Sequence, residues 1–151
     1  MVDNYDLPVQ PSNSGMFFDP DDDHSFVGER YWHGTAGEGL TIMDLVALQA
    51  DGFWDQADAD VEAETDAMIG FACATVNGAD TLNIVLAPAV VRDDTWAWAT
   101  IGAPVYVSAT PGAVTDEEPS GAGQFVRKIG YVLDADAIFF EGFGQVTVIP
   151  E

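Results

Sequence analysis

The chain has 151 residues, of which 48% are hydrophobic and 11% aromatic, so it can bury the core of one folded domain. Its 26 Asp and Glu residues face only 4 Lys and Arg, giving a formal net charge of -22. Four basic residues cannot form the patch on which phosphate binding depends, which argues against DNA, RNA and anionic membranes as partners. No apolar run approaches the roughly 20 residues of a membrane span, and the acidic start of the chain lacks the features of a secretory signal.

Residues 1–38 are predicted to form an irregular, extended, loop-rich arm. The segment is rich in Pro and Gly, and no helical or strand period persists in it. It also carries clustered apolar side chains, which must bury against either the chain's own barrel or a neighbouring subunit or shell surface. Both alternatives stay open. The candidate interface residues in the arm are Met16, Phe17, Phe18, Tyr31 and Trp32.

The acidic run of the arm is a weak candidate for a metal site. The spacing of Asp19, Asp21 and Asp23 matches the start of a calcium-binding loop, but His24 and Arg30 stand where that loop needs Gly and Glu. A solvated acidic loop that attracts loosely bound cations is therefore favoured. The two histidines have no second pair of ligands at zinc-site spacing, so no cofactor is expected.

From residue 39 to residue 151, the sequence predicts an all-β domain, either a small β-barrel or a β-sandwich. Turn signals such as Asn77-Gly78 and Thr110-Pro111-Gly112 separate short runs rich in β-branched and aromatic residues. The acidic segment 55–66 lacks an apolar stripe and is predicted to be a loop rather than a helix. The predicted strands lie within 40–48, 67–75, 82–86, 96–99, 105–107, 125–133, 137–140 and 145–149.

Three side chains in this domain have two interpretations each. Trp96 and Trp98 alternate with alanines, so a strand would place both indoles on one face. An inward face favours burial in the core or between subunits, which we prefer, and an outward face favours a protein or sugar partner. Both tryptophans are candidate interface residues. Cys73 lies in an apolar run and is predicted to be a small buried side chain rather than a reactive thiol.

The sequence predicts no enzymatic activity. It contains no Gly-x-Ser-x-Gly nucleophile motif, and no cysteine–histidine pairing stands out. A glycosidase needs two carboxylates in a cleft, but among 26 acidic residues any one pair is weak evidence.

Two segments carry a resemblance to a known class of proteins. The sequences GAPVYVSATPGAVT (102–115) and PSGAGQFVRKIGYVL (119–133), followed by AIFF (137–140), resemble a C-terminal β-barrel module of structural proteins from tailed phages and related tailed viruses, including head decoration proteins. The resemblance extends over roughly residues 40–149 and rests on hairpin and strand motifs. It implies a virion protein that works through contact surfaces. Within the second segment, Gly130 is expected to permit a bulge or close packing beside the following strand, and Arg127 is expected to pair with an acidic neighbour.

The acidity departs from that family and suggests a salt-adapted host. Self-repulsion at a charge of -22 opposes folding in dilute buffer, whereas molar salt shortens the Debye length to about 3 Å. We therefore expect a capsid decoration protein of a tailed virus from a high-salt, haloarchaeal environment, assembled in the host cytoplasm and placed on the capsid surface of the virion. Its expected partners are the major capsid protein and copies of itself in a homotrimer. The alternatives are a tail or fibre component that binds a host receptor, and a virion-associated glycan hydrolase.

Overall fold

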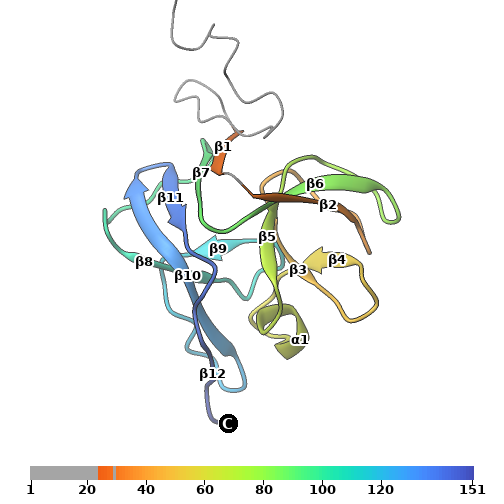
Figure 1. The fold of residues 1–151 in the computed structure, drawn as a ribbon. Helices are drawn as coiled ribbons and strands as arrows, with labels where there is room; N and C mark the ends of the chain where they lie inside the picture. The colour runs from red at the N-terminus through yellow and green to blue at the C-terminus, as the bar shows by residue number, and fades with distance from the viewer. Residues whose placement is uncertain (1–23, 29) are drawn as a thin grey trace, which may run out of the picture.

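The computed structural model describes residues 24–28 and 30–151, which form two antiparallel β-sheets of seven and five strands (Figure 1). This confirms the all-β prediction. Neither sheet closes on itself, so the architecture agrees with the β-sandwich alternative rather than with a closed barrel.

The seven-stranded sheet is built around one long central strand. This strand, β10 (Phe125–Asp134), shifts register between Lys128 and Gly130 where it pairs with β8. A Cβ atom on Gly130 would lie 1.9 Å from the carbonyl oxygen of Phe139, so only glycine allows this close approach and the predicted irregularity is present. Across the sheet the order is β1 (His24–Gly28), β7 (Ala89–Asp93), β11 (Ala137–Phe140), β10, β8 (Pro104–Val107) and β9 (Val114–Thr115), and β12 (Val146–Val148) also pairs with β10.

The five-stranded sheet is curled. A single parallel bridge joins Ala36, just after its first strand, to Trp54 in its last strand, and the amide of Gly37 donates to the Trp54 carbonyl at 2.9 Å. The two edges of the sheet thus approach each other without forming a continuous ladder. The strand order is β2 (Tyr31–Thr35), β6 (Thr81–Leu86), β5 (Ile69–Ala72), β3 (Leu45–Leu48) and β4 (Trp54–Gln56).

Two apolar clusters hold this arrangement together. The larger lies between the sheets, where the rings of Phe71 and Phe140 meet edge-on with centroids 5.0 Å apart. The smaller fills the curl of the five-stranded sheet and contains Trp54 and Val46. Strand β3 therefore buries both faces, since Leu45 contributes to the first cluster and Val46 to the second. That accounts for its continuous apolar sequence.

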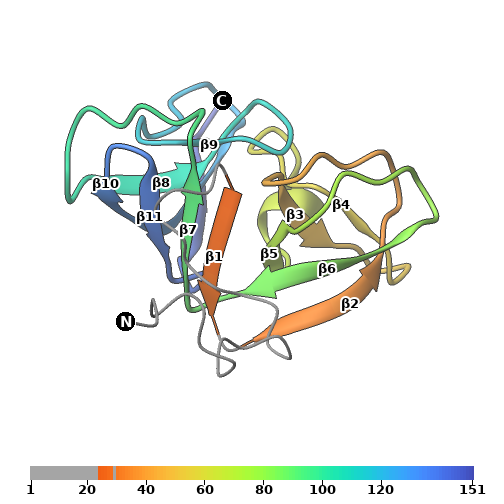
Figure 2. The same cartoon turned by 90° about the horizontal axis from the view of Figure 1, so that it is seen from above.

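The folded region begins earlier than the sequence indicates. The predicted arm ran to residue 38, but β1 and β2 lie within that range and are members of the two sheets. Long-range pairing with β7 and β6 stabilises these two strands. The sequence did not predict them, because their glycines and polar residues have a low local preference for strands. Seen from above, β1 lies at the junction of the two sheets (Figure 2). The arm candidates Met16, Phe17, Phe18, Asp19, Asp21 and Asp23 lie outside the described residues.

The turns largely follow their predicted chemistry. The amide of Ala113 donates to the Thr110 carbonyl at 3.0 Å, and Gly112 has φ +76°, as the predicted type II turn requires. Strands β5 and β6 pair antiparallel on either side of Asn77-Gly78. Segment 55–66 is mainly loop but contains one helical turn, α1 (Glu62–Thr65). No helix in the described ranges is long and apolar enough to cross a membrane.

Candidate functional site

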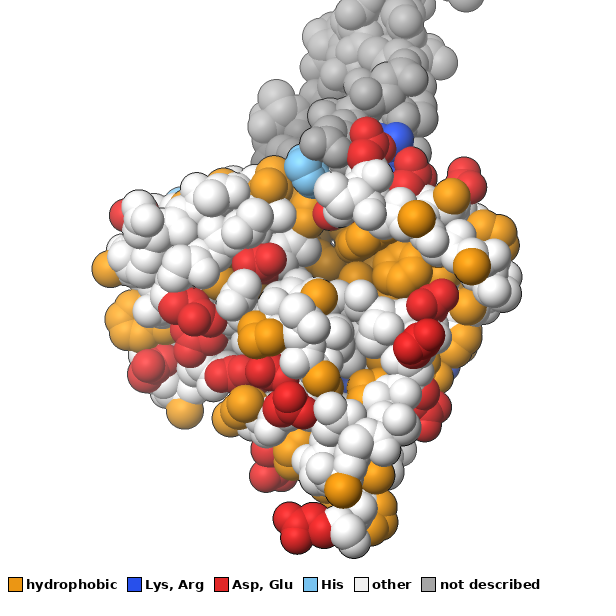
Figure 3. Space-filling view, turned by 180° about the vertical axis from the view of Figure 1, so that it is seen from behind, with side chains coloured by type: hydrophobic (Ala, Val, Ile, Leu, Met, Phe, Trp, Pro, Cys, Tyr) orange, Lys and Arg blue, Asp and Glu red, His pale blue; other side chains and the backbone are white. Residues whose placement is uncertain are grey.

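The two sheets leave a cleft of about 490 Å³ at one end of the sandwich. Seen from the side opposite to Figure 1, the molecule shows apolar side chains in a hollow beside a histidine, with acidic side chains spread over the rest of that face (Figure 3). One wall is formed by the ends of β1 and β7 and by Trp96. The other is formed by residues 41–44, before β3, and by the 111–114 turn region. The cleft therefore collects side chains from segments that lie far apart in the sequence.

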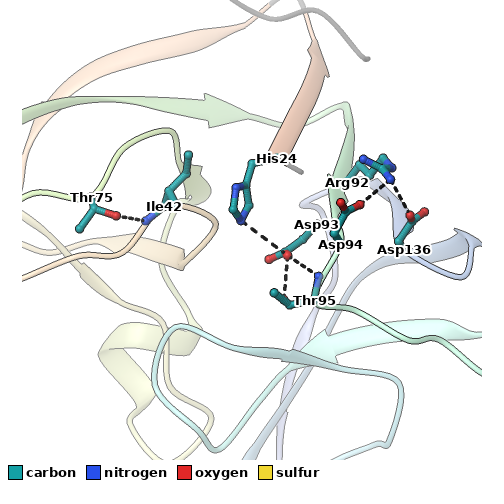
Figure 4. A network of polar contacts seen from close by, with 8 residues as sticks. All are labelled: His24, Ile42, Thr75, Arg92, Asp93, Asp94, Thr95 and Asp136. Atoms are coloured by element: carbon teal, nitrogen blue, oxygen red, sulfur yellow. Dashed lines mark hydrogen bonds and ion pairs between the residues drawn. The ribbon is translucent and has the colours of Figure 1, made fainter. Parts of the chain in front are cut away.

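The β1 wall of the cleft ends in a histidine–aspartate pair. His24 and Asp93 are cross-strand partners, two positions beyond the buried pair Phe26 and Val91, and so they continue the inner face of the seven-stranded sheet. The His24 Nε2 and Asp93 Oδ1 atoms lie 3.7 Å apart (Figure 4). Asp93 is buried, and its carboxylate also accepts two hydrogen bonds from Thr95, at 2.8 Å from the backbone amide and 2.7 Å from the hydroxyl.

These contacts of Asp93 end strand β7, so Trp96 and Trp98 do not lie on the strand that was predicted for them. The amide of Trp96 donates to the Asp93 carbonyl at 3.0 Å, so the chain turns directly after β7. The prediction that Trp96 and Trp98 lie on a strand is therefore wrong. The Asp93 side chain stabilises an Asx-type turn, and this turn forms in place of the strand that the apolar alternation predicts.

Both indoles nevertheless gather on one side of the molecule. Their ring centroids are 5.4 Å apart, and Trp96 meets the edge of Phe71 at 6.3 Å. Both are half-buried and pack against the larger core cluster. Trp96 also lines the cleft, so part of it stays available to a ligand or partner. A role of either residue in an interface stays a prediction.

Asp44 forms part of the opposite wall of the cleft. Its carboxylate accepts hydrogen bonds from the Thr41 amide at 2.8 Å and from Gln56 Nε2 at 2.9 Å. Burial raises the pKa of Asp44 above its ordinary value. A cleft with an aromatic wall, a histidine and two carboxylates can bind a neutral polar ligand such as a sugar through stacking and hydrogen bonds. Within residues 24–28 and 30–151, no three His, Cys, Asp or Glu side chains are arranged to hold a metal ion.

Neither carboxylate of this cleft was predicted from the sequence to be a site residue. Asp93 could have been suspected, since Asp-x-Thr after an apolar strand is typical of a side-chain turn. Asp44 carries no such signal, because its place in the cleft depends on how the two sheets pack.

Tyr31 and Trp32 lie on β2, the edge strand of the five-stranded sheet. Their cross-strand partners on β6 are the buried residues Val85 and Ile84. Tyr31 is nevertheless 39% exposed and Trp32 is 59% exposed. The structure thus places these two candidates on the surface, away from the cleft end where Trp96 lies.

Arg127 is in a different environment from the expected one. Instead of pairing with an acidic side chain, its guanidinium donates to three backbone carbonyls, at 2.7 Å to Thr65, 2.5 Å to Ala67 and 2.9 Å to Gly142. Burial lowers the pKa of Arg127. Arg92 does pair with acids, namely Asp94 and Asp136, the latter at 2.9 Å (Figure 4).

Cys73 is half-buried and packs against the larger core cluster. Its Sγ lies 3.7 Å from the Phe71 carbonyl oxygen. Burial raises the pKa of the thiol to about 12, so the thiol stays protonated at neutral pH and is a poor nucleophile.

No family model matches this chain, and searches of curated proteins and of solved structures found no match.

Proposed function

We propose that this chain is a non-enzymatic virion protein that decorates the capsid of a tailed virus from a high-salt environment. One observation carries the proposal: an edge strand presents two large exposed aromatic side chains, Tyr31 and Trp32, on an otherwise strongly acidic chain. Exposed aromatic residues are frequent anchors of protein interfaces.

A decoration protein stabilises a shell by burying surface rather than by chemistry. Repeated attachment over the capsid lattice makes weak single contacts strong together. In this proposal, Tyr31 and Trp32 contact the major capsid protein, and three copies associate around a three-fold axis of the shell. Assembly takes place in the host cytoplasm. The acidic surface keeps the virion soluble at molar salt, where charge repulsion between neighbouring copies is screened.

The test is the reattachment of purified protein to capsids from which it has been removed. Trp32→Ala should lower occupancy at least about tenfold at subsaturating concentration, the effect of losing one anchor residue. Val148→Ala is the matched control, because Val148 is 52% exposed and lies on β12, which pairs with β10 in the other sheet. Equal attachment of wild type and Trp32→Ala would overturn the role of this edge.

A second variant separates the edge strand from the arm. Deletion of residues 1–23 ends just before β1 and leaves all described strands in place, whereas deletion to residue 38 would remove β1 and β2. If the arm supplies shell contacts through Met16, Phe17 and Phe18, the shorter chain should remain folded and attach more weakly. Unchanged attachment would remove the arm from the proposal.

The cleft supports a second candidate function, recognition of a host-surface glycan by a tail or fibre component. Its basis is the placement of Trp96 beside His24, Asp44 and Asp93 in one cleft. Calorimetric titration with host-surface polysaccharide should then show binding that Trp96→Leu abolishes. Absence of binding would remove this candidate, and release of new reducing ends would point to the glycan hydrolase alternative.

A further inference from the structure

The outer face of the seven-stranded sheet carries a continuous row of apolar side chains. Successive cross-strand partners connect Val27 to Val90, Val90 to Phe139, Phe139 to Tyr131, and Tyr131 to Pro104. This apolar row thus crosses β1, β7, β11, β10 and β8. Its members alternate along their strands with core residues such as Val91 and Ile138, so they point away from the core. Val27 is 41% exposed and the other four are partly exposed.

Each end of the apolar row is flanked by a basic residue. Arg30 lines a groove of about 250 Å³ together with Val27, Val90 and Phe139. At the other end, Lys128 Nζ lies 4.6 Å from the centroid of the Tyr131 ring and donates to the Tyr131 hydroxyl at 2.6 Å. Two of only four basic residues of the chain therefore border one apolar surface.

The five-stranded side of the molecule lacks such basic residues. Between Tyr31 and Ala87 the chain has no Lys or Arg. It has ten acidic residues there, namely Glu38, Asp44, Asp51, Asp55, Asp58, Asp60, Glu62, Glu64, Asp66 and Asp80. From residue 88 to residue 151 the chain has nine acidic and three basic residues, so both sides are acidic, but the basic side chains after Tyr31 all belong to the seven-stranded side.

This acidic side contains a cavity of about 280 Å³ lined by Asp51, Phe53 and Asp55, which we call the acidic pocket. Phe53 is an exposed aromatic side chain at its rim. Among the ion pairs found within the described ranges, none includes Asp51 or Asp55. Burial, followed by repulsion from Glu38 and Asp51, raises the pKa of Asp55. A basic side chain from outside would relieve this crowding of carboxylates.

We propose that the apolar row of one copy packs against the acidic pocket of the next copy, head to tail, so that identical contacts close a ring. The number of copies, three, rests on the proposed function. Arg30 and Lys128 of one copy would meet the carboxylates around Phe53 of its neighbour. Association through two different faces gives a ring when the rotation closes.

A two-fold dimer of apolar rows is disfavoured by charge. It would bring Arg30 and Lys128 of both copies into one interface, while the acidic pockets stayed unpartnered. At molar salt the Debye length is about 3 Å, so only charges in direct contact matter. The apolar row then supplies most of the affinity, and the basic residues at its ends select the partner surface.

The first test is the mass of the full-length protein by analytical ultracentrifugation in about 2 M KCl, where charge repulsion is screened. Wild type should sediment as a trimer and Val27→Asp as a monomer. Val148→Asp is the matched control, because Val148 is 52% exposed and lies on β12, outside the apolar row. This variant should remain a trimer. A trimeric Val27→Asp protein with native near-UV circular dichroism would overturn the proposal.

Mixing two defective proteins tests the head-to-tail geometry. Val27→Asp keeps an intact acidic pocket, and Phe53→Lys keeps an intact apolar row. Each should be monomeric alone, and together they should form a one-to-one dimer that grows no further. A mixture that stays monomeric would overturn the geometry.

Other occupants of the row give distinct results. The wild type could be monomeric while the variant without residues 1–23 is trimeric. This result would show that the chain's own first segment covers the apolar row. A wild type that is monomeric in both forms would overturn the ring. Neither result decides the proposed function, which is measured separately by attachment to capsids.

Discussion

Replacing Arg127 with Met should strongly destabilise the fold. The guanidinium joins three segments, since it donates to the carbonyls of Thr65 at the end of α1, Ala67 before β5 and Gly142 after β11. Hydrogen bonds that involve a charged group contribute about 1.5–3 kcal/mol each, and a buried acceptor left without a donor costs about 1–3 kcal/mol. Methionine recovers part of this loss by burying apolar surface without a charge. We expect the free energy of unfolding to fall by about 4 kcal/mol.

Urea denaturation in molar KCl, followed by tryptophan fluorescence, measures this difference. Arg127→Lys is the matched variant, because it keeps the charge but not the planar fork that reaches three acceptors, and it should lose about half as much. A loss below about 1 kcal/mol for Arg127→Met would refute the reasoning, since it would mean that the three carbonyls find other donors at little cost.

Three further predictions address charge and packing. Near-UV circular dichroism should show tertiary structure that is lost as salt falls, and a full signal at about 50 mM salt would contradict the salt adaptation inferred from the net charge of -22. Because the folded-state pKa of Asp55 is raised, the folded protein binds more protons than the unfolded chain, so stability should rise as pH falls through that raised pKa toward 3.8. Asp55→Asn should flatten this part of the profile in urea titrations, and an unchanged slope would exclude Asp55 as its source. Gly130→Ala should lose up to about 3 kcal/mol through collision with the backbone of Phe139. Gly123→Ala, with φ +80° and open space, should lose only about 1 kcal/mol, and equal losses in urea would refute the packing argument.

Local signals predicted several strands and turns of the C-terminal half, although they missed β7 and β9 and predicted a strand at 96–99 that is absent. The turn at Pro111-Gly112 and the irregularity at Gly130 follow from backbone restrictions of single residues, which a sequence displays directly. Strands β1 and β2 were missed because their pairing with β7 and β6 determines them. Their sequences, HSFVG and YWHGT, lack sustained alternation.

The candidate site was harder to predict, since long-range packing determines it. Asp44 and Asp93 come from the two sheets and lie on facing walls of the cleft, and their spacing in the sequence does not predict this proximity. Arg127 was expected to pair with an acid, but the packing of distant segments brings three backbone carbonyls within hydrogen-bond distance of its guanidinium. The two tryptophans were placed on a strand because their alternation outweighed the turn signal of Asp93 and Thr95. By contrast, Tyr31 and Trp32 were singled out from the sequence as a cluster of aromatic residues and lie exposed on the edge strand, while their role in an interface stays a prediction.

The central claim, that this chain decorates a capsid, is tested most directly by its copy number in purified virions. Quantitative mass spectrometry, with the major capsid protein as the internal standard, counts the copies per particle. Decoration predicts hundreds of copies, in a fixed ratio to the major capsid protein. A few to a few dozen copies per particle would contradict it and place the protein in the tail.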